Sequence, residues 1–219
     1  MPRRVALSLG SLPTARTWSA DMKTTLLILL SGAFGLAAPS SYQLRPVQGA
    51  ILELTVEKTG FLNGKRHVFN FPRYQGTLLF DPDVPEKAAM TLGIEAASIS
   101  CHDAWLSAKD LKKVQEYALK DILAVDRFPR ITFRSTTIRK IDIDRYEASG
   151  NLTIRDVSSP VVVTVVLRTG PAGSLVLEGA SSILLTAFGL KPPTAALGTI
   201  GTRNEMAFRF VVVATHAPE

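Results

Sequence analysis

Residues 107–138 read SAKDLKKVQEYALKDILAVDRFPRITFRSTTI, and this segment combines two kinds of periodicity. In its first part apolar residues recur at the spacing of one helix face, and Ser107 stands three residues before Asp110, which resembles a helix-capping box. After residues 127–129 (RFP) the apolar residues alternate with polar ones. The segment therefore predicts one amphipathic α-helix, over about residues 108–126, which a proline corner joins to a β-strand.

On both sides of this segment the sequence is typical of β-strands. In residues 51–57 every second side chain is apolar, which predicts a strand with one buried face. Further short strands are expected at residues 67–71, 75–80, 88–99, 130–138, 146–154, 161–167, 175–179, 182–188 and 205–214. Some eight or nine strands, separated by frequent turn signals, predict an antiparallel sandwich or barrel. A closed barrel is favoured because closure removes exposed strand edges.

Composition indicates a single globular domain with a sizeable core. The chain has 219 residues, of which 46% are hydrophobic and 20% charged. Its net charge is +6, and +3 of this lies in residues 1–37, where four basic residues oppose one aspartate. The remaining +3 is spread over 182 residues. This charge is too weak and scattered to indicate a nucleic-acid partner.

The N-terminus has the pattern of a secretory signal peptide. Lys23 precedes an apolar run at residues 24–36, and small residues follow it. We expect residues 1–37 to be the signal peptide, with cleavage after Ala37, and Met22 to be an alternative start. The run is shorter than the roughly 20 residues that span a bilayer. The prediction is a periplasmic or secreted protein, without a stable membrane span after cleavage, whose residues 38–219 form one domain.

Signals for catalysis or metal binding are weak. The single cysteine, Cys101, precedes His102 and Asp103, but neighbouring residues of an extended segment point to opposite faces. Cys101 and His102 are therefore poorly placed to act as nucleophile and base. Residues 60–65 lack the glycine spacing of a phosphate loop. The sequence predicts no catalytic residue, no metal and no cofactor, with an enzyme based on Cys101 as a minor alternative.

The most informative remaining feature is the excess of apolar alternation. A small barrel has an interior about wide enough for its own side chains or for one slender ligand. Candidates for the barrel lining, and so for ligand binding, are Leu52, Leu54, Val56, Phe71, Met90, Leu92, Ile94, Ile131, Phe133, Leu152, Ile154, Phe208 and Phe210. Two alternatives stay open: these side chains surround a ligand, or they fill the core themselves. Which strand parity faces inward is also open.

Five sequence patterns occur in an order that resembles a known family. They are Phe71-x-x-Tyr74-x-Gly76-x-Leu78-x-Phe80-Asp81-Pro82, Ala97-Ser98-Ile99, Phe128-Pro129-x-Ile131-x-Phe133-x-Ser135-Thr136, Gly150-x-Leu152-Thr153-Ile154-x-x-Val157-x-x-Pro160-Val161 and Phe188-Gly189. Together they resemble the YceI-like family of lipocalin-like proteins over most of residues 50–214.

The resemblance implies an eight-stranded antiparallel barrel with one inserted helix near one end. It also implies a non-catalytic periplasmic binding protein that holds a polyisoprenoid, or another long-chain lipid such as a fatty-acyl chain, inside the barrel. The alternative function is a structural or stress-related barrel whose own side chains fill the core, without a ligand. A second copy of the chain, in a homodimer, is a possible partner. Residues 46–50 lack the Asp-x-x-His-Ser pattern that begins many members. We therefore expect no headgroup contact of that kind there.

Overall fold

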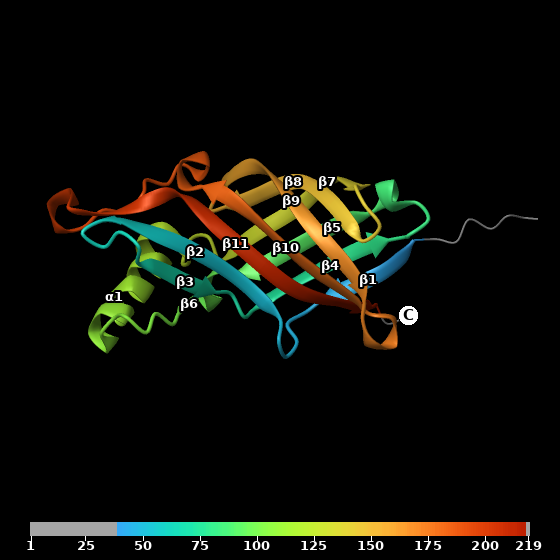
Figure 1. Cartoon of the computed structure of the whole chain (residues 1–219), viewed down its shortest axis with the longest axis horizontal. Coiled ribbons are helices and arrows are strands. Elements are labelled where there is room, and N and C mark those ends of the chain that lie inside the picture. The colour runs from blue at the N-terminus through green and yellow to red at the C-terminus, as the bar shows by residue number, and fades with distance from the viewer. Residues whose placement is uncertain (1–38, 218–219) are drawn as a thin grey trace, which may run out of the picture. The chain divides into compact units, whose positions relative to one another are not determined.

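The computed structural model describes residues 39–217. The expected signal peptide, its cleavage after Ala37 and the alternative start at Met22 lie outside the described residues. Within the described part the chain is mainly β-structure with a single α-helix, as predicted (Figure 1).

Eight strands form a closed antiparallel barrel, which confirms the predicted fold. Each strand pairs with the next in the order given, and the pairing of the last with the first closes the barrel. The strands are β1 (Ser40–Leu44), β4 (Tyr74–Phe80), β5 (Ala89–Glu95), β7 (Arg130–Lys140), β8 (Arg145–Ile154), β9 (Val157–Thr169), β10 (Leu175–Leu184) and β11 (Ile200–His216).

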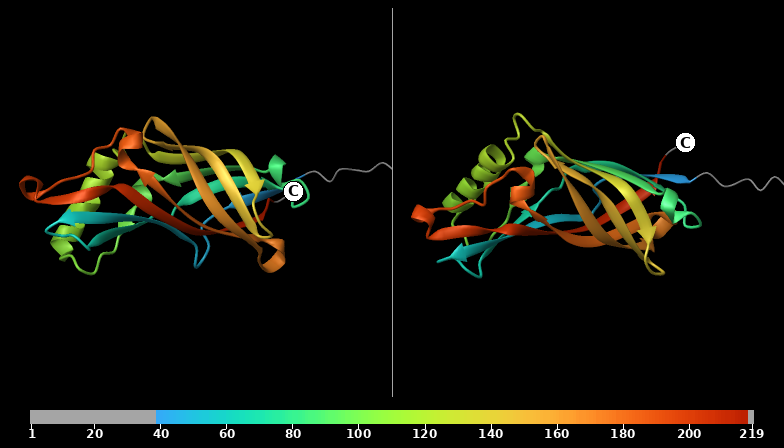
Figure 2. Two further views of the ribbon diagram at one scale, coloured as in Figure 1. Left: turned by 45° about the horizontal axis from the view of Figure 1, so that its top comes forward. Right: turned by 90° about the horizontal axis from the view of Figure 1, so that it is seen from above.

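Three further strands extend the sheet at one end of the barrel. They are β2 (Ile51–Gly60), β3 (Arg66–Asn70) and β6 (Ser100–Cys101). The long strand β11 makes this possible, because its last residues pair with β1 and its earlier residues pair with β2. The extension and the helix lie at the same end of the barrel (Figures 1 and 2).

The helix begins as predicted and ends earlier. Helix α1 (Ala108–Tyr117) is capped by Ser107, whose hydroxyl oxygen accepts a hydrogen bond from the Asp110 amide at 3.1 Å. A π-helical turn (Ala118–Ile122) completes it. Ala124 then adopts a left-handed conformation (φ 48°), which ends the helix before the predicted residue 126. Within residues 39–217, no helix has the length and apolar character needed to cross a membrane.

Several strand boundaries differ from those expected. β1 was not predicted, because a strand with only Tyr42 and Leu44 on its buried face gives too short an alternation. β10 is continuous where two segments were expected, and residues 185–188 form a 3₁₀ turn. Other 3₁₀ turns occupy residues 85–87, 96–98, 171–173 and 196–198.

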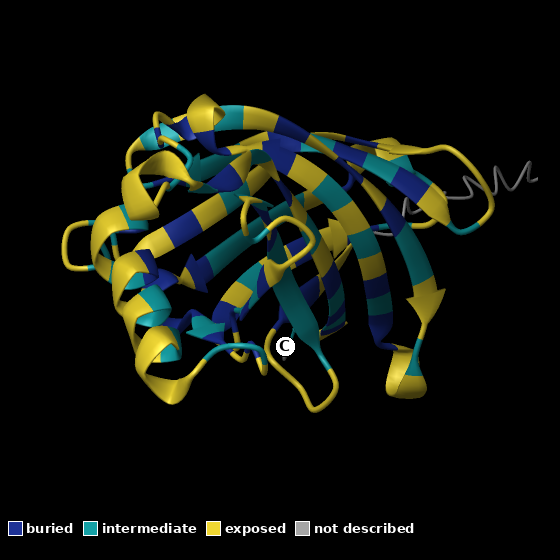
Figure 3. Ribbon diagram, turned by 60° about the vertical axis from the view of Figure 1, so that its left-hand side comes forward, coloured by how far each residue is buried: buried dark blue, intermediate teal, exposed yellow. Residues whose placement is uncertain are grey.

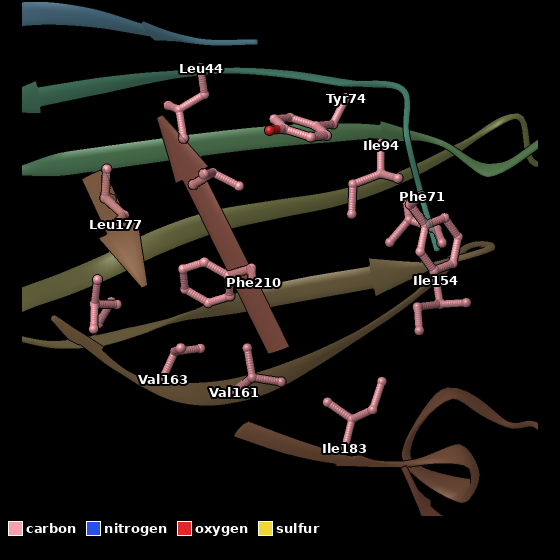
Figure 4. Close-up of a cluster of buried hydrophobic side chains, with 14 of the residues drawn as sticks. Leu44, Phe71, Tyr74, Ile94, Ile154, Val161, Val163, Leu177, Ile183 and Phe210 are labelled. Carbon is pink, nitrogen blue, oxygen red and sulfur yellow. The ribbon is translucent and has the colours of Figure 1, made fainter. Parts of the chain in front are cut away.

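The core lies inside the barrel, and buried residues alternate with more exposed ones along several strands (Figure 3). Side chains from several strands converge there (Figure 4). Two inward positions are glycines that lie beneath aromatic rings. A Cβ atom at Gly150 would come within 2.6 Å of the Phe133 ring, and one at Gly179 within 2.5 Å of the Phe210 ring. The absence of a Cβ at these positions therefore makes room for the two rings.

Candidate ligand-binding site

The barrel contains an inner compartment of about 130 Å³ whose lining is almost wholly apolar. Twelve of the thirteen candidate lining residues contribute to its wall, from strands β2, β5, β7, β8 and β11 and from Phe71 beyond the end of β3. Val56, the thirteenth, lines the adjoining compartment. The candidate residues therefore lie on the inward-facing side of these strands, which answers the question of strand parity that the sequence left open.

About half of these lining residues are only partly buried. They are Leu52, Leu54, Met90, Leu92, Phe133, Leu152 and Phe208. Their strand register places them in cross-strand rows inside the barrel, such as Leu92 beside Phe133 and Phe133 beside Leu152. The surface that remains accessible therefore faces the cavity, and it is apolar surface that a ligand could cover.

An outer compartment of about 410 Å³ adjoins the inner one at the helix end of the barrel. Its wall includes Val114 and Tyr117 of α1 and residues 193–195 of the loop before β11. Five residues line both compartments: Leu54, Phe71, Ile131, Ile154 and Ile183. The two spaces thus share a wall along the barrel, and Figure 4 labels two of the shared residues, Phe71 and Ile154, among the buried side chains.

Hydrogen bonds of two side chains, Gln115 and Arg155, hold helix α1 and the π-helical turn after it against neighbouring segments. The Gln115 side chain accepts a hydrogen bond from the Cys101 amide at 3.0 Å and donates one to the Ile99 carbonyl. After the π turn, the Arg155 guanidinium donates to the carbonyl of Ile122 at 2.8 Å and to that of Asp121. Carbonyls at a helix C-terminus lack intrahelical partners, so Arg155 satisfies two of them from the turn between β8 and β9.

Lys58 places a charged group in the wall of the outer compartment. It continues the inward row of Leu52, Leu54 and Val56 on β2, and only 9% of it is exposed. Its ammonium donates a hydrogen bond of 3.2 Å to the Thr202 hydroxyl, and burial lowers its pKa below the usual value. The strand predicted from the sequence ended at residue 57. Extending the same alternation by one step would have identified Lys58.

A second polar cluster, formed by His67, Cys101 and Asp103, lies buried beside this compartment. Asp103 accepts hydrogen bonds from the His67 ring at 2.6 Å, from the Cys101 thiol at 3.2 Å and from the Val68 amide at 3.0 Å. The His67 ring also stacks on Trp105, with 5.4 Å between ring centroids. The expected separation of Cys101 from His102 is observed, because His102 is exposed and lies within hydrogen-bonding distance of the Ser100 hydroxyl.

The chemistry of this cluster favours a structural role. Its donor atoms lie within 4.8 Å of one another, and imidazole, thiolate and carboxylate are groups that hold zinc. This set of three residues was not predicted, because His67 stands 34 residues before Cys101 in the sequence. Burial and the Asp103 carboxylate raise the pKa of the Cys101 thiol to about 12. Cys101 is thus a neutral thiol near pH 7, which makes it a poor nucleophile.

Comparison with known protein families matches residues 42–214 to the YceI-like domain. The chain belongs to the YceI-like family. Among curated YceI-like relatives, a UPF0312 protein of Photorhabdus laumondii is 27% identical over 153 residues, which cover 67% of this chain and 73% of the relative. A UPF0312 protein of Pectobacterium atrosepticum is 28% identical over 140 residues, which cover 63% and 66%.

Solved structures share the YceI-like fold at low sequence identity. BcnA of Burkholderia cenocepacia has a TM-score of 0.59 and 21% identity, and the match covers 75% of this chain and 96% of BcnA. A polyisoprenoid-binding domain of Saccharophagus degradans, implicated in plant cell wall breakdown, has a TM-score of 0.58 and 9% identity. That match covers 82% of this chain and 99% of the domain. At these identities the likeness shows the fold alone.

Proposed function

We propose that this YceI-like protein is a non-catalytic binding protein, secreted or periplasmic, that holds a long apolar or amphiphilic chain inside its barrel. The observation that carries this proposal is the pair of adjoining compartments, of which the inner one is lined almost wholly by apolar atoms. A polyisoprenoid or a fatty-acyl chain has the matching chemistry. The thirteen lining residues identified from the sequence are the proposed ligand contacts.

The volumes of the two compartments limit how much of a ligand each can hold. The inner space alone is close to a cavity of about 150 Å³ that accepts one benzene molecule. A long chain must therefore also occupy the outer compartment, whose volume falls in the range of about 300–1,000 Å³ of small-molecule sites. Each buried methylene contributes about 0.8 kcal/mol, so a dozen carbons supply about 10 kcal/mol before the cost of association.

Two further observations support a binding role. The Saccharophagus degradans domain, which shares the fold, is a polyisoprenoid-binding domain, and we extend that ligand class to this chain as part of the proposal. The only cysteine is buried and has a pKa raised to about 12, which disfavours nucleophilic catalysis.

The second candidate function is a structural or stress-related barrel without ligand. The observation that favours it is the small volume of the inner compartment, whose wall includes the rings of Phe71, Phe133, Phe208 and Phe210. Phe69 adds a fifth ring in the wall of the outer compartment. Under this alternative the purified protein would carry nothing.

Native mass spectrometry of the protein purified from its host separates the two candidates. We expect a bound mass in the wild type and in Asn151→Trp, because Asn151 is exposed on the outer face of β8. Leu152→Trp, one residue along the same strand, puts the same indole into the inner compartment and should lose the bound mass while remaining folded. A wild-type protein without adduct, which also takes up no dodecanol or dodecanoate, would favour the self-filled barrel.

The proposed location has a separate test. N-terminal sequencing of the protein from the periplasmic or secreted fraction should begin at Ala38. An intact N-terminus, or recovery in the cytoplasmic fraction, would contradict it.

A further inference from the structure

The buried lysine of the outer compartment has no evident structural purpose. The Lys58 ammonium has three N–H donors, and its side chain makes one hydrogen bond, to Thr202, within residues 39–217. No carboxylate of those residues lies within ion-pair distance of it. A buried charge without a counter-ion destabilises a fold. An apolar residue of similar length would continue the row of Leu52, Leu54 and Val56 at lower cost.

Nearby charged groups are already engaged. The His67 ring is held by Asp103 at 2.6 Å, and Glu57, which precedes Lys58 on the opposite face of β2, pairs with Arg203 at 2.7 Å. Lys113 also borders the compartment, but its side chain is largely exposed and pairs with Asp110 at 3.3 Å. Among the described residues that line this compartment, Lys58 is therefore the cationic side chain that is buried and has no carboxylate as a counter-ion.

We propose that Lys58 binds the anionic headgroup of an amphiphile, a carboxylate or a phosphate, whose chain extends into the inner compartment. This inference rests on the proposed function and names its ligand class. Thr202, which holds the ammonium, and Thr194, also in the wall, are the polar neighbours of the headgroup.

The layout of the cavity gives the ligand a direction. Polar atoms occur in the lining of the outer compartment and are almost absent from the inner one. The headgroup lies near Lys58 beneath α1, and the chain runs past Leu54 and Phe71 toward Phe210. The Lys58 methylenes lie along the apolar wall, as lysine stems often do, while the ammonium meets the headgroup.

Three ligands with one chain length test this assignment. Isothermal titration calorimetry at pH 8 compares dodecanoate, dodecyl phosphate and dodecan-1-ol, which differ only in the headgroup. We expect wild type to bind at least one anion about 10- to 100-fold more tightly than the alcohol, as for a charge-assisted hydrogen bond. The preferred anion then distinguishes carboxylate from phosphate.

Variants assign the preference to Lys58. Lys58→Met should bind the alcohol as wild type does and lose the preference for the anion, whereas Lys58→Arg should keep it. Lys112→Met removes the same unit of charge from an exposed position of α1 that does not line the cavity, and it should keep the preference. Thermal unfolding accompanies each titration, and we expect Lys58→Met to be at least as stable as wild type.

Different outcomes test the role of Lys58 and the binding of a chain by the barrel. Equal affinity of wild type for anion and alcohol, or an anion preference that survives in Lys58→Met, overturns the role of Lys58 and leaves chain binding intact. Failure of wild type to bind any of the three ligands overturns the proposed function and this inference with it.

Discussion

Tyr74 offers the sharpest test of the barrel interior. It lies on β4 with 7% of its surface exposed, and its hydroxyl is fully buried without a hydrogen-bond partner among the described residues. Figure 4 shows the ring inside the barrel, and burial raises the pKa of the phenol. An unpaired buried polar group costs about 1–3 kcal/mol. Tyr74→Phe removes this cost and keeps the ring, so the free energy of unfolding should rise by about that amount.

Urea denaturation and thermal unfolding of the ligand-free protein measure the effect. In a domain of this size each kcal/mol shifts Tm by about 2–4 °C, so Tyr74→Phe should raise Tm by roughly 2–12 °C. Tyr146→Phe is the matched control. Its ring is equally buried and packs edge-to-face on Phe80, but its hydroxyl is not a fully buried unpaired atom. We expect little change there. A loss of stability in Tyr74→Phe would show that the hydroxyl has a partner, such as an internal water, and would refute the reasoning.

Three further predictions concern the wall, the thiol and the helix. Phe210→Ala uncovers Gly179 and enlarges the inner compartment. It should lower the free energy of unfolding, measured by urea titration, by about 3–5 kcal/mol. A loss below about 1 kcal/mol would contradict tight packing around Phe210. The pKa of the Cys101 thiol is about 12 in the folded protein and 9.0 for a free thiol. The protonated thiol therefore stabilises the fold fully below about pH 9, and this stabilisation is lost as the pH rises toward 12. The free energy of unfolding of Cys101→Ala, measured over this pH range, should lack that decline. Arg155→Ala should speed amide hydrogen exchange in residues 118–125 while the barrel strands stay protected, and unchanged exchange would show that these hydrogen bonds do not hold the helix.

Much of the fold followed from local patterns, because burial inside a barrel imposes a strict period of two. The row Leu52, Leu54, Val56 and the pair Ile131, Phe133 display it without interruption, and all five side chains face the cavity. The helix start was equally predictable, since Ser107 and Asp110 form a local cap. Such features depend only on residues close in sequence.

The polar features of the site depend on pairings that the sequence does not display. His67 meets Asp103 because β3 pairs with β6, a strand of two residues without a periodic signal. The predicted strand ended at residue 57 because Thr59 and Gly60, which follow Lys58, are residues typical of a strand end. In the structure β2 continues to Gly60, whose left-handed conformation (φ 68°) forms the turn. Pairing with the long strand β11 prolongs β2 beyond its apolar segment.

The position of Lys58 bears on the choice between a ligand-binding barrel and a self-filled one. A core that only had to pack would be more stable with an apolar residue there, because burial of the ammonium lowers its pKa and costs stability. Natural proteins often keep a residue that lowers stability where function requires that residue. If Lys58→Met raises the stability of the ligand-free protein and at the same time abolishes the preference for anionic chains, the lysine is kept for binding. If it raises stability and leaves the anion preference unchanged, Lys58 has no role in headgroup binding, and only a wild-type protein that takes up no chain at all would favour the self-filled barrel.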